Sequence, residues 1–195
     1  MDIIKQSDSR IGEIIGADSI GLSIQCYRLY DSPALGSIIS VGDPSVYAVV
    51  SEIRTEGLDP SRPVIARGQS ESNEEAVYLN NPQLSELLTT RFRALIIGYQ
   101  IDDEISVGLP PLPPRIHAFA WFCERDTIRD LTSTSAFLRL LLDSGVPDEV
   151  VAACIRFAAL TLQDEHQFKV QCTKALAMEL VGQTPRLNAM LRRLS

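Results

Sequence analysis

The run Leu109-Pro110-Pro111-Leu112-Pro113-Pro114-Arg115 divides the chain into two parts with different sequence periodicity. Proline lacks a backbone N–H and has a fixed φ, so such a run neither continues a helix nor enters the middle of a sheet. Before the run, short apolar stretches alternate with Gly, Pro, Asp and Ser; from Thr127 onward, apolar residues recur at helical spacing. The run therefore predicts a seam between a strand-rich part and a helix-rich part.

The part before the run is predicted to form a small antiparallel β-barrel. In residues 20–27, apolar side chains alternate with Gly, Ser and Gln, which is the pattern of a half-buried strand. Other strands are expected at residues 11–15, 38–41, 46–54, 92–101 and 104–107, with a further short one at Val64-Ile65-Ala66. Short strands at close spacing, with glycines suited to bends and bulges, predict a barrel over residues 1–115.

A polar, acidic stretch at residues 69–82 interrupts these strands. We expect it to be a surface excursion, with an acidic ligand loop as the alternative. Asn81-Pro82 then predicts a short helix over residues 83–88.

The part after the seam is predicted to be a helical bundle over residues 125–195. Pro147-Asp148-Glu149 opens one helix with proline in the first turn and acids at the positive end of the helix dipole. Helices are expected at residues 136–142, 147–162, 165–181 and 184–194. Residues 116–124 are either an extended connector or the last strand. The predicted fold class is therefore α+β with segregated parts.

Charge is spread unevenly over these two parts. Residues 1–124 carry 9 Lys/Arg and 17 Asp/Glu, a net charge of −8, whereas residues 125–195 carry 9 and 8, a net charge of +1. An acidic half repels phosphate backbones, so the charge argues against a nucleic-acid partner.

The four cysteines, Cys26, Cys123, Cys154 and Cys172, form no C-x-x-C pair. Free thiols are typical of a reducing compartment. The N-terminus has no signal-peptide layout, and no apolar run approaches the ~20 residues that span a bilayer. We therefore expect a cytoplasmic protein without a transmembrane segment.

Several short segments resemble the HAS-barrel domain, which is named for the HerA ATPases and the ATP synthase subunits. They are Ile11-Gly12-Glu13-Ile14-Ile15-Gly16, the strand at 46–54 after a Gly-Asp turn, Leu95-Ile96-Ile97-Gly98-Tyr99, the Asp102-Asp103 hairpin, and the proline run. The resemblance covers residues 8–124 and implies a barrel that serves in docking and ring assembly.

The chain departs from that family after the barrel. HerA-like ATPases continue into a P-loop core, but no Gly-Lys pair and no G-x-x-x-x-G-K-[ST] motif occurs here. The resemblance thus implies the barrel domain without the ATPase core. The leading hypothesis is a non-enzymatic interaction or assembly module that binds a protein partner or forms a homo-oligomer; a nucleic-acid-binding barrel is an alternative.

Two sets of residues are candidates for partner binding. Pro110, Pro113 and Arg115 match P-x-x-P-x-R, a polyproline II ligand motif, and Trp121 follows in an aromatic segment. We favour a structural connector over a presented peptide. The second set is Leu187, Leu191, Arg192 and Arg193, for which a core-facing helix is the plainer interpretation.

The sequence indicates no catalytic constellation, no cofactor and no metal site, and it points to no particular small-molecule ligand. His117 is expected to be a partly buried core histidine, and His166 a solvated residue at a helix start. An enzyme with a site in the barrel–helix cleft around His117 and Cys123 is the remaining alternative, although apolar surroundings raise a thiol pKa.

Overall fold

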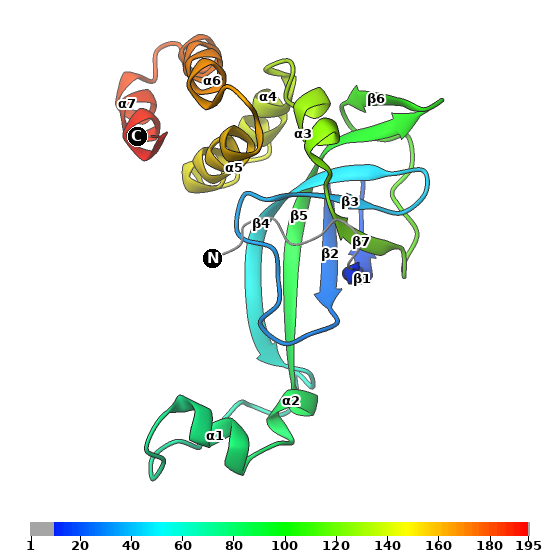
Figure 1. Cartoon of the computed structure of the whole chain (residues 1–195), viewed down its shortest axis with the longest axis vertical. Helices are drawn as coiled ribbons and strands as arrows, with labels where there is room; N and C mark the ends of the chain where they lie inside the picture. The colour runs from blue at the N-terminus through cyan, green and yellow to red at the C-terminus, as the bar shows by residue number, and fades with distance from the viewer. Residues whose placement is uncertain (1–9, 195) are drawn as a thin grey trace.

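The computed structural model describes residues 10–194, in which there are seven strands and seven helices (Figure 1). The strands are β1 (Arg10–Ala17), β2 (Gly21–Cys26), β3 (Ile38–Val41), β4 (Val46–Gly57), β5 (Leu88–Ile101), β6 (Glu104–Val107) and β7 (Phe119–Phe122). The helices are α1 (Glu74–Asn80), α2 (Leu84–Leu87), α3 (Arg125–Leu131), α4 (Ala136–Asp143), α5 (Asp148–Thr161), α6 (Glu165–Glu179) and α7 (Thr184–Leu194).

All strands belong to one antiparallel sheet with the order β2-β1-β7-β3-β4-β5-β6. An additional pairing between β2 and β5 closes six of the strands into a ring, and β6 extends from β5 as a hairpin. The prediction of an antiparallel sheet followed by helices is confirmed. Within residues 116–124, β7 pairs with both β1 and β3, so this segment contributes a strand to the ring.

Alternation along the strands divides their side chains between two apolar clusters. One set, which includes Ile24, Val50 and Phe92, forms a buried cluster made only of side chains from the ring. Residues of the opposite set, Ile38 and Val49 among them, belong to a second cluster together with the C-terminal helices. The sheet is therefore apolar on both faces where the helices cover it.

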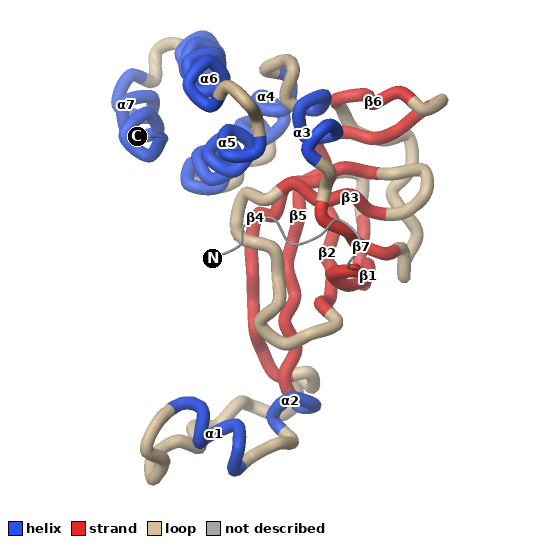
Figure 2. Tube along the Cα trace, in the orientation of Figure 1, coloured by secondary structure: helices blue, strands red, loops and turns tan. Residues whose placement is uncertain are grey.

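Helix α5 is the centre of the helical part, as its nearly continuous apolar sequence predicts. Eight of its residues are buried, and it packs against α3, α4, α6 and α7 (Figure 2). It also contacts β3 and β4, so it lies directly against the sheet. The helical part is thus joined to the ring through a shared apolar core.

Strands β4 and β5 run beyond the rest of the sheet and carry residues 58–87, which we call the arm (Figure 1). Helices α1 and α2 lie in the arm, so the helices are not confined to the C-terminal part. Helix α1 was not predicted; it begins where the Asn73 side chain accepts a hydrogen bond from the Ala76 N–H at 2.9 Å. The strand predicted at Val64–Ala66 is wrong, because this segment has no strand partner in the structure.

A tyrosine pair joins the arm to the body of the protein. The Tyr30 and Tyr78 hydroxyls are hydrogen bonded, and their rings meet edge to face with centroids 6.2 Å apart. The Tyr30 N–H also donates to Thr90 Oγ1 on β5 at 2.8 Å. Through Tyr30, α1 thus contacts the loop between β2 and β3, and that loop is in turn bonded to β5.

Candidate functional site

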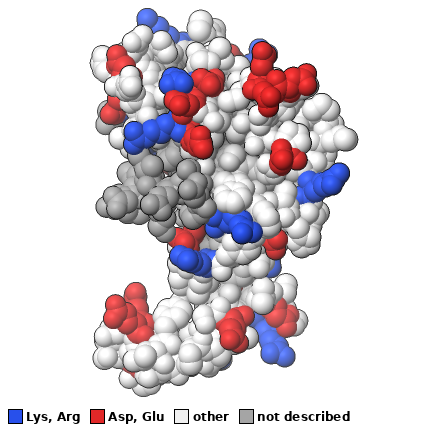
Figure 3. Space-filling view, turned by 45° about the vertical axis from the view of Figure 1, so that its right-hand side comes forward, with Lys and Arg blue, Asp and Glu red and all other residues white. Residues whose placement is uncertain are grey.

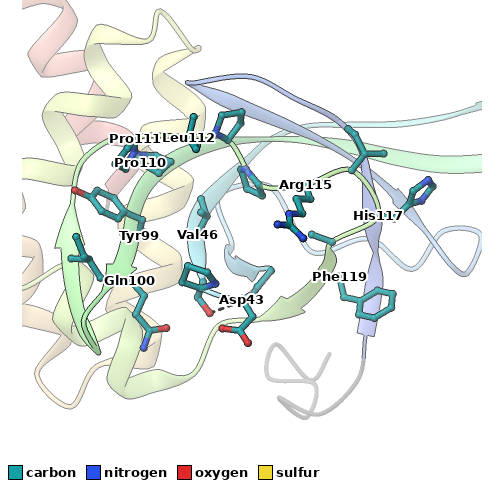
Figure 4. A pocket seen from close by; sticks show the side chains of 18 of the residues that line it. Asp43, Val46, Tyr99, Gln100, Pro110, Pro111, Leu112, Arg115, His117 and Phe119 are labelled. Carbon is teal, nitrogen blue, oxygen red and sulfur yellow. Dashed lines mark hydrogen bonds between the residues drawn. The ribbon is translucent and has the colours of Figure 1, made fainter.

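A groove of about 900 Å³ lies where three segments meet at one end of the ring (Figure 4). The segments are residues 42–46 in the β3–β4 turn, residues 99–101 at the end of β5, and residues 110–119 with Trp121. The turn is tight because Gly42 has φ +77°, a backbone conformation that favours glycine. Sheet pairing between β4 and β5 brings the first two segments together.

The proline run forms one wall of this groove and carries exposed apolar side chains. Leu112 is 79% exposed, Ile116 50% and Phe119 39%. Proline fixes φ, so the wall is stiff even though it has no regular secondary structure. The groove therefore presents a rigid, largely apolar surface to solvent.

Charged side chains lie on both sides of the groove. Arg115 projects inward from the proline wall, and Asp43 lies across from it on the β3–β4 turn (Figure 4). Within the part of the chain that the structure describes, neither side chain has an ion pair or a hydrogen bond. Both charges are thus available to a bound molecule.

Aromatic side chains support the outer end of the groove. The Phe119 and Trp121 rings meet edge to face with centroids 6.4 Å apart. The Arg10 guanidinium lies 4.7 Å from the Phe119 centroid and 5.9 Å from that of Trp121, within the range of a cation–π contact. This stacking ties the first described strand to the groove.

The structure brings one predicted set of binding residues together and separates it from the other. Pro110, Pro113, Arg115 and Trp121 all line the groove. Sequence reasoning missed Leu112, Ile116 and Phe119 as part of this surface. The sequence did contain a signal for them. Large apolar residues occur within and just after the proline run, and such a run is not expected to enter the middle of a sheet.

The C-terminal set lies on α7, away from the groove (Figure 1). Leu187 and Leu191 are partly buried against the helical core. Arg193 Nε lies 3.0 Å from Glu149 Oε2, and the pKa of Glu149 is lowered by hydrogen bonds from Arg156 and then Arg193. Arg192 is exposed. These contacts are those of a helix packed on its own domain, and a partner-binding role for α7 stays a prediction.

The prediction that His117 is partly buried is wrong. Its side chain is 73% exposed, and its Nδ1 lies 3.4 Å from Glu13 Oε2. His117 lies two residues beyond the proline run, on the groove wall, whereas Cys123 lines a second, neighbouring cavity of about 260 Å³ with Tyr47 and Glu124. His166, by contrast, is an exposed residue in the first turn of α6, as predicted.

Comparison with known proteins assigns no family to this fold. The chain matches no model of a known protein family, and no curated protein is significantly similar to it in sequence. Any function must therefore be argued from the geometry of the groove and its surroundings.

Two further features of the described residues bear on this argument. No group of three or more His, Cys, Asp or Glu side chains in residues 10–194 is placed to hold a metal ion. Among the helices in the same range, none combines the length and the apolar content needed to cross a bilayer.

The four cysteines are free thiols, and burial raises the pKa of each. The pKa is about 12 for Cys26, Cys123 and Cys172, and it is raised further for Cys154. In the unfolded chain a thiol ionises near pH 8.5. The folded state therefore holds protons that the unfolded state releases between about pH 9 and pH 12.

We expect the free energy of unfolding to fall as pH rises above about 9, because in that range the unfolded state binds fewer protons than the folded state. Urea titrations at a series of pH values measure this slope. A variant with Cys154→Ala and Cys172→Ala is expected to show a shallower slope. An unchanged slope in that variant contradicts the assignment of the effect to these thiols.

Proposed function

We propose that this protein is a non-enzymatic interaction or assembly module whose groove binds a protein segment. The observation that carries the proposal is the exposure of Leu112 and Ile116 on a stiff wall beside Arg115, a guanidinium with no partner among the described residues. Apolar side chains gathered in a concave surface with a few polar groups are typical of binding sites.

The stiffness of the wall favours binding. A surface that is already ordered loses little conformational entropy when a partner docks, so more of the contact energy appears as affinity. Aromatic and arginine side chains are enriched among the residues that contribute most to interfaces. Trp121, Phe119 and Arg115 supply those residue types at the groove.

The same proposal treats the ring of strands as a HAS-like β-barrel. Six antiparallel strands with closed pairing and a continuous apolar cluster inside the ring support that interpretation. In HAS-like proteins the barrel serves docking and ring assembly, and here helices α3–α7 follow the ring where HerA-like ATPases have an ATPase core. The free thiols are compatible with a cytoplasmic setting.

No specific observation favours either alternative, nucleic-acid binding or enzymatic activity. The acidic N-terminal half disfavours nucleic acid, and the groove is lined by a single arginine with no lysine. For an enzyme, His117 and Cys123 would have to converge, but they line different cavities.

Affinity purification from the native cell, followed by mass spectrometry, tests the proposal. The tagged full-length chain is compared with Leu112→Asp, which places a charge at the most exposed apolar position of the groove. Val181→Asp is the matched control, because Val181 is 78% exposed but lies just beyond α6, away from the groove.

We expect the wild type and Val181→Asp to retain the same protein, either a different chain or an untagged copy of this one, and Leu112→Asp to lose most of it. Identical retained proteins for all three forms would rule out the groove as the binding surface.

A further inference from the structure

The arm exposes an apolar segment that no other part of residues 10–194 covers. Residues 60–70 are exposed throughout, and in Arg62-Pro63-Val64-Ile65-Ala66-Arg67 the exposed fractions of Val64 and Ile65 are 63% and 61%. β-Branched residues in an extended segment are typical of a strand. Here they lack the strand partner that would bury them.

The arm and the groove lie at opposite ends of the same two strands. Strand β4 begins at Val46 in the groove and ends at Gly57 at the arm, and β5 runs from Leu88 back to Ile101 at the groove. Twelve residues of β4 span roughly 40 Å at about 3.3 Å per residue. One molecule therefore carries the groove at one end of these strands and the exposed segment at the other.

The arginines that flank the arm segment are opposite in sign to the aspartates at the groove, while each surface as a whole carries more acidic than basic side chains. The arm stands apart as a lobe with acidic side chains on its surface (Figure 3), and its sequence contains Glu71, Glu74 and Glu75. Arg62 and Arg67 flank the apolar segment; Arg62 Nε lies 3.4 Å from Asp59 Oδ2, and Arg67 donates a hydrogen bond to Asn81 Oδ1 at 3.5 Å. At the groove, Arg115 projects from the proline wall and Asp43 lies opposite it. Two further carboxylates, Asp102 and Asp103, follow Ile101.

We propose that residues 62–67 of one copy bind in the groove of a second copy, so that molecules associate head to tail. This inference rests on the proposed function and names the arm of another copy as the ligand of the groove. Val64 and Ile65 would cover Leu112 and Ile116, with the acidic helix α1 toward Arg115 and the flanking arginines toward the carboxylates. Such a contact is heterologous, and it generates a ring or a filament instead of a two-fold dimer.

Two double variants of the full-length chain test the inference. One alters the groove, Leu112→Asp with Ile116→Asp; the other alters the arm, Val64→Asp with Ile65→Asp. Both introduce the same charge, so the two altered surfaces repel each other and cannot form a new contact. All four positions are at least half exposed, so both variants should fold; circular dichroism and the Tm check this.

Sedimentation velocity over a wide range of concentrations measures the association. We expect the wild type and Val181→Asp to self-associate as concentration rises, and each double variant alone to associate at least about 30-fold more weakly. An equimolar mixture of the two double variants should form a one-to-one complex and nothing larger, because one intact arm and one intact groove remain.

Three results overturn the inference: a wild type that stays monomeric throughout, double variants that associate like the wild type, or a mixture that recovers no complex. A monomeric wild type whose Leu112→Asp form still loses a different protein in the affinity purification leaves the proposed function standing. Retention of the same proteins by Leu112→Asp removes the proposed function itself.

Discussion

Replacing Gly36 with alanine is expected to destabilise the protein by roughly 3–5 kcal/mol, the sum of backbone strain and overpacking. Gly36 has φ +82°, and a Cβ on it would lie 2.5 Å from the Ala153 carbonyl carbon and the Cys154 nitrogen. Those atoms are backbone atoms of α5, which cannot move aside as a flexible side chain can. Either α5 or the loop that carries Gly36 would have to shift to admit one methyl group.

Gly145→Ala is the matched control for this substitution. Gly145 has φ +75°, but nothing lies within 4 Å of the position that its Cβ would occupy. It should therefore lose only the ~1–2 kcal/mol of left-handed backbone strain. Urea unfolding of both variants gives the difference, and equal losses would contradict close packing of α5 on Gly36.

Leu131→Ala is expected to cost about 2–5 kcal/mol, because it removes a fully buried side chain from the core shared by the helices and the sheet. Leu131 Cδ2 lies only 2.6 Å from the point where Gly98 of β5 would carry a Cβ, so this leucine packs directly on the sheet. Leu112→Ala, at a position 79% exposed, should change stability by less than about 0.5 kcal/mol.

The Leu131→Ala variant also tests whether the predicted parts at 1–115 and 125–195 unfold separately. Trp121 is the only tryptophan and reports on the ring, while far-ultraviolet circular dichroism reports mainly on the helices. A shared core predicts that both signals shift together in one transition. A shift in the dichroism alone would show that the two parts are independent units.

The strands and C-terminal helices were predictable because their patterns are local. Residues 20–27 alternate cleanly, and β2 forms at Gly21–Cys26; the helix expected at 184–194 forms as α7. The strand predicted in the arm was wrong because its formation depends on a non-local contact. Val64-Ile65-Ala66 has the composition of a strand, but a strand requires a partner, and sequence does not say whether one is present in the same molecule.

The groove could not be predicted from sequence patterns, because three segments that are distant in the sequence form it. Pro110, Pro113, Arg115 and Trp121 were found through a motif, yet their surroundings depend on the β4–β5 pairing that brings residues 42–46 and 99–101 beside them. His117 was misplaced because its apolar neighbours suggested burial, whereas it lies on the connector before β7, beside Glu13 of β1.

If the arm of each molecule binds in the groove of the next, the Tyr30–Tyr78 contact affects the geometry of the assembly. The angle at which α1 leaves the ring then sets the rotation from each molecule to the next, and a repeated rotation decides between a closed circle and an open spiral. Two hydroxyl groups outside the interface would in this way govern the curvature of the whole assembly. Tyr78→Phe keeps the ring and removes one hydroxyl, so it should alter the shape of the assembly more than its affinity.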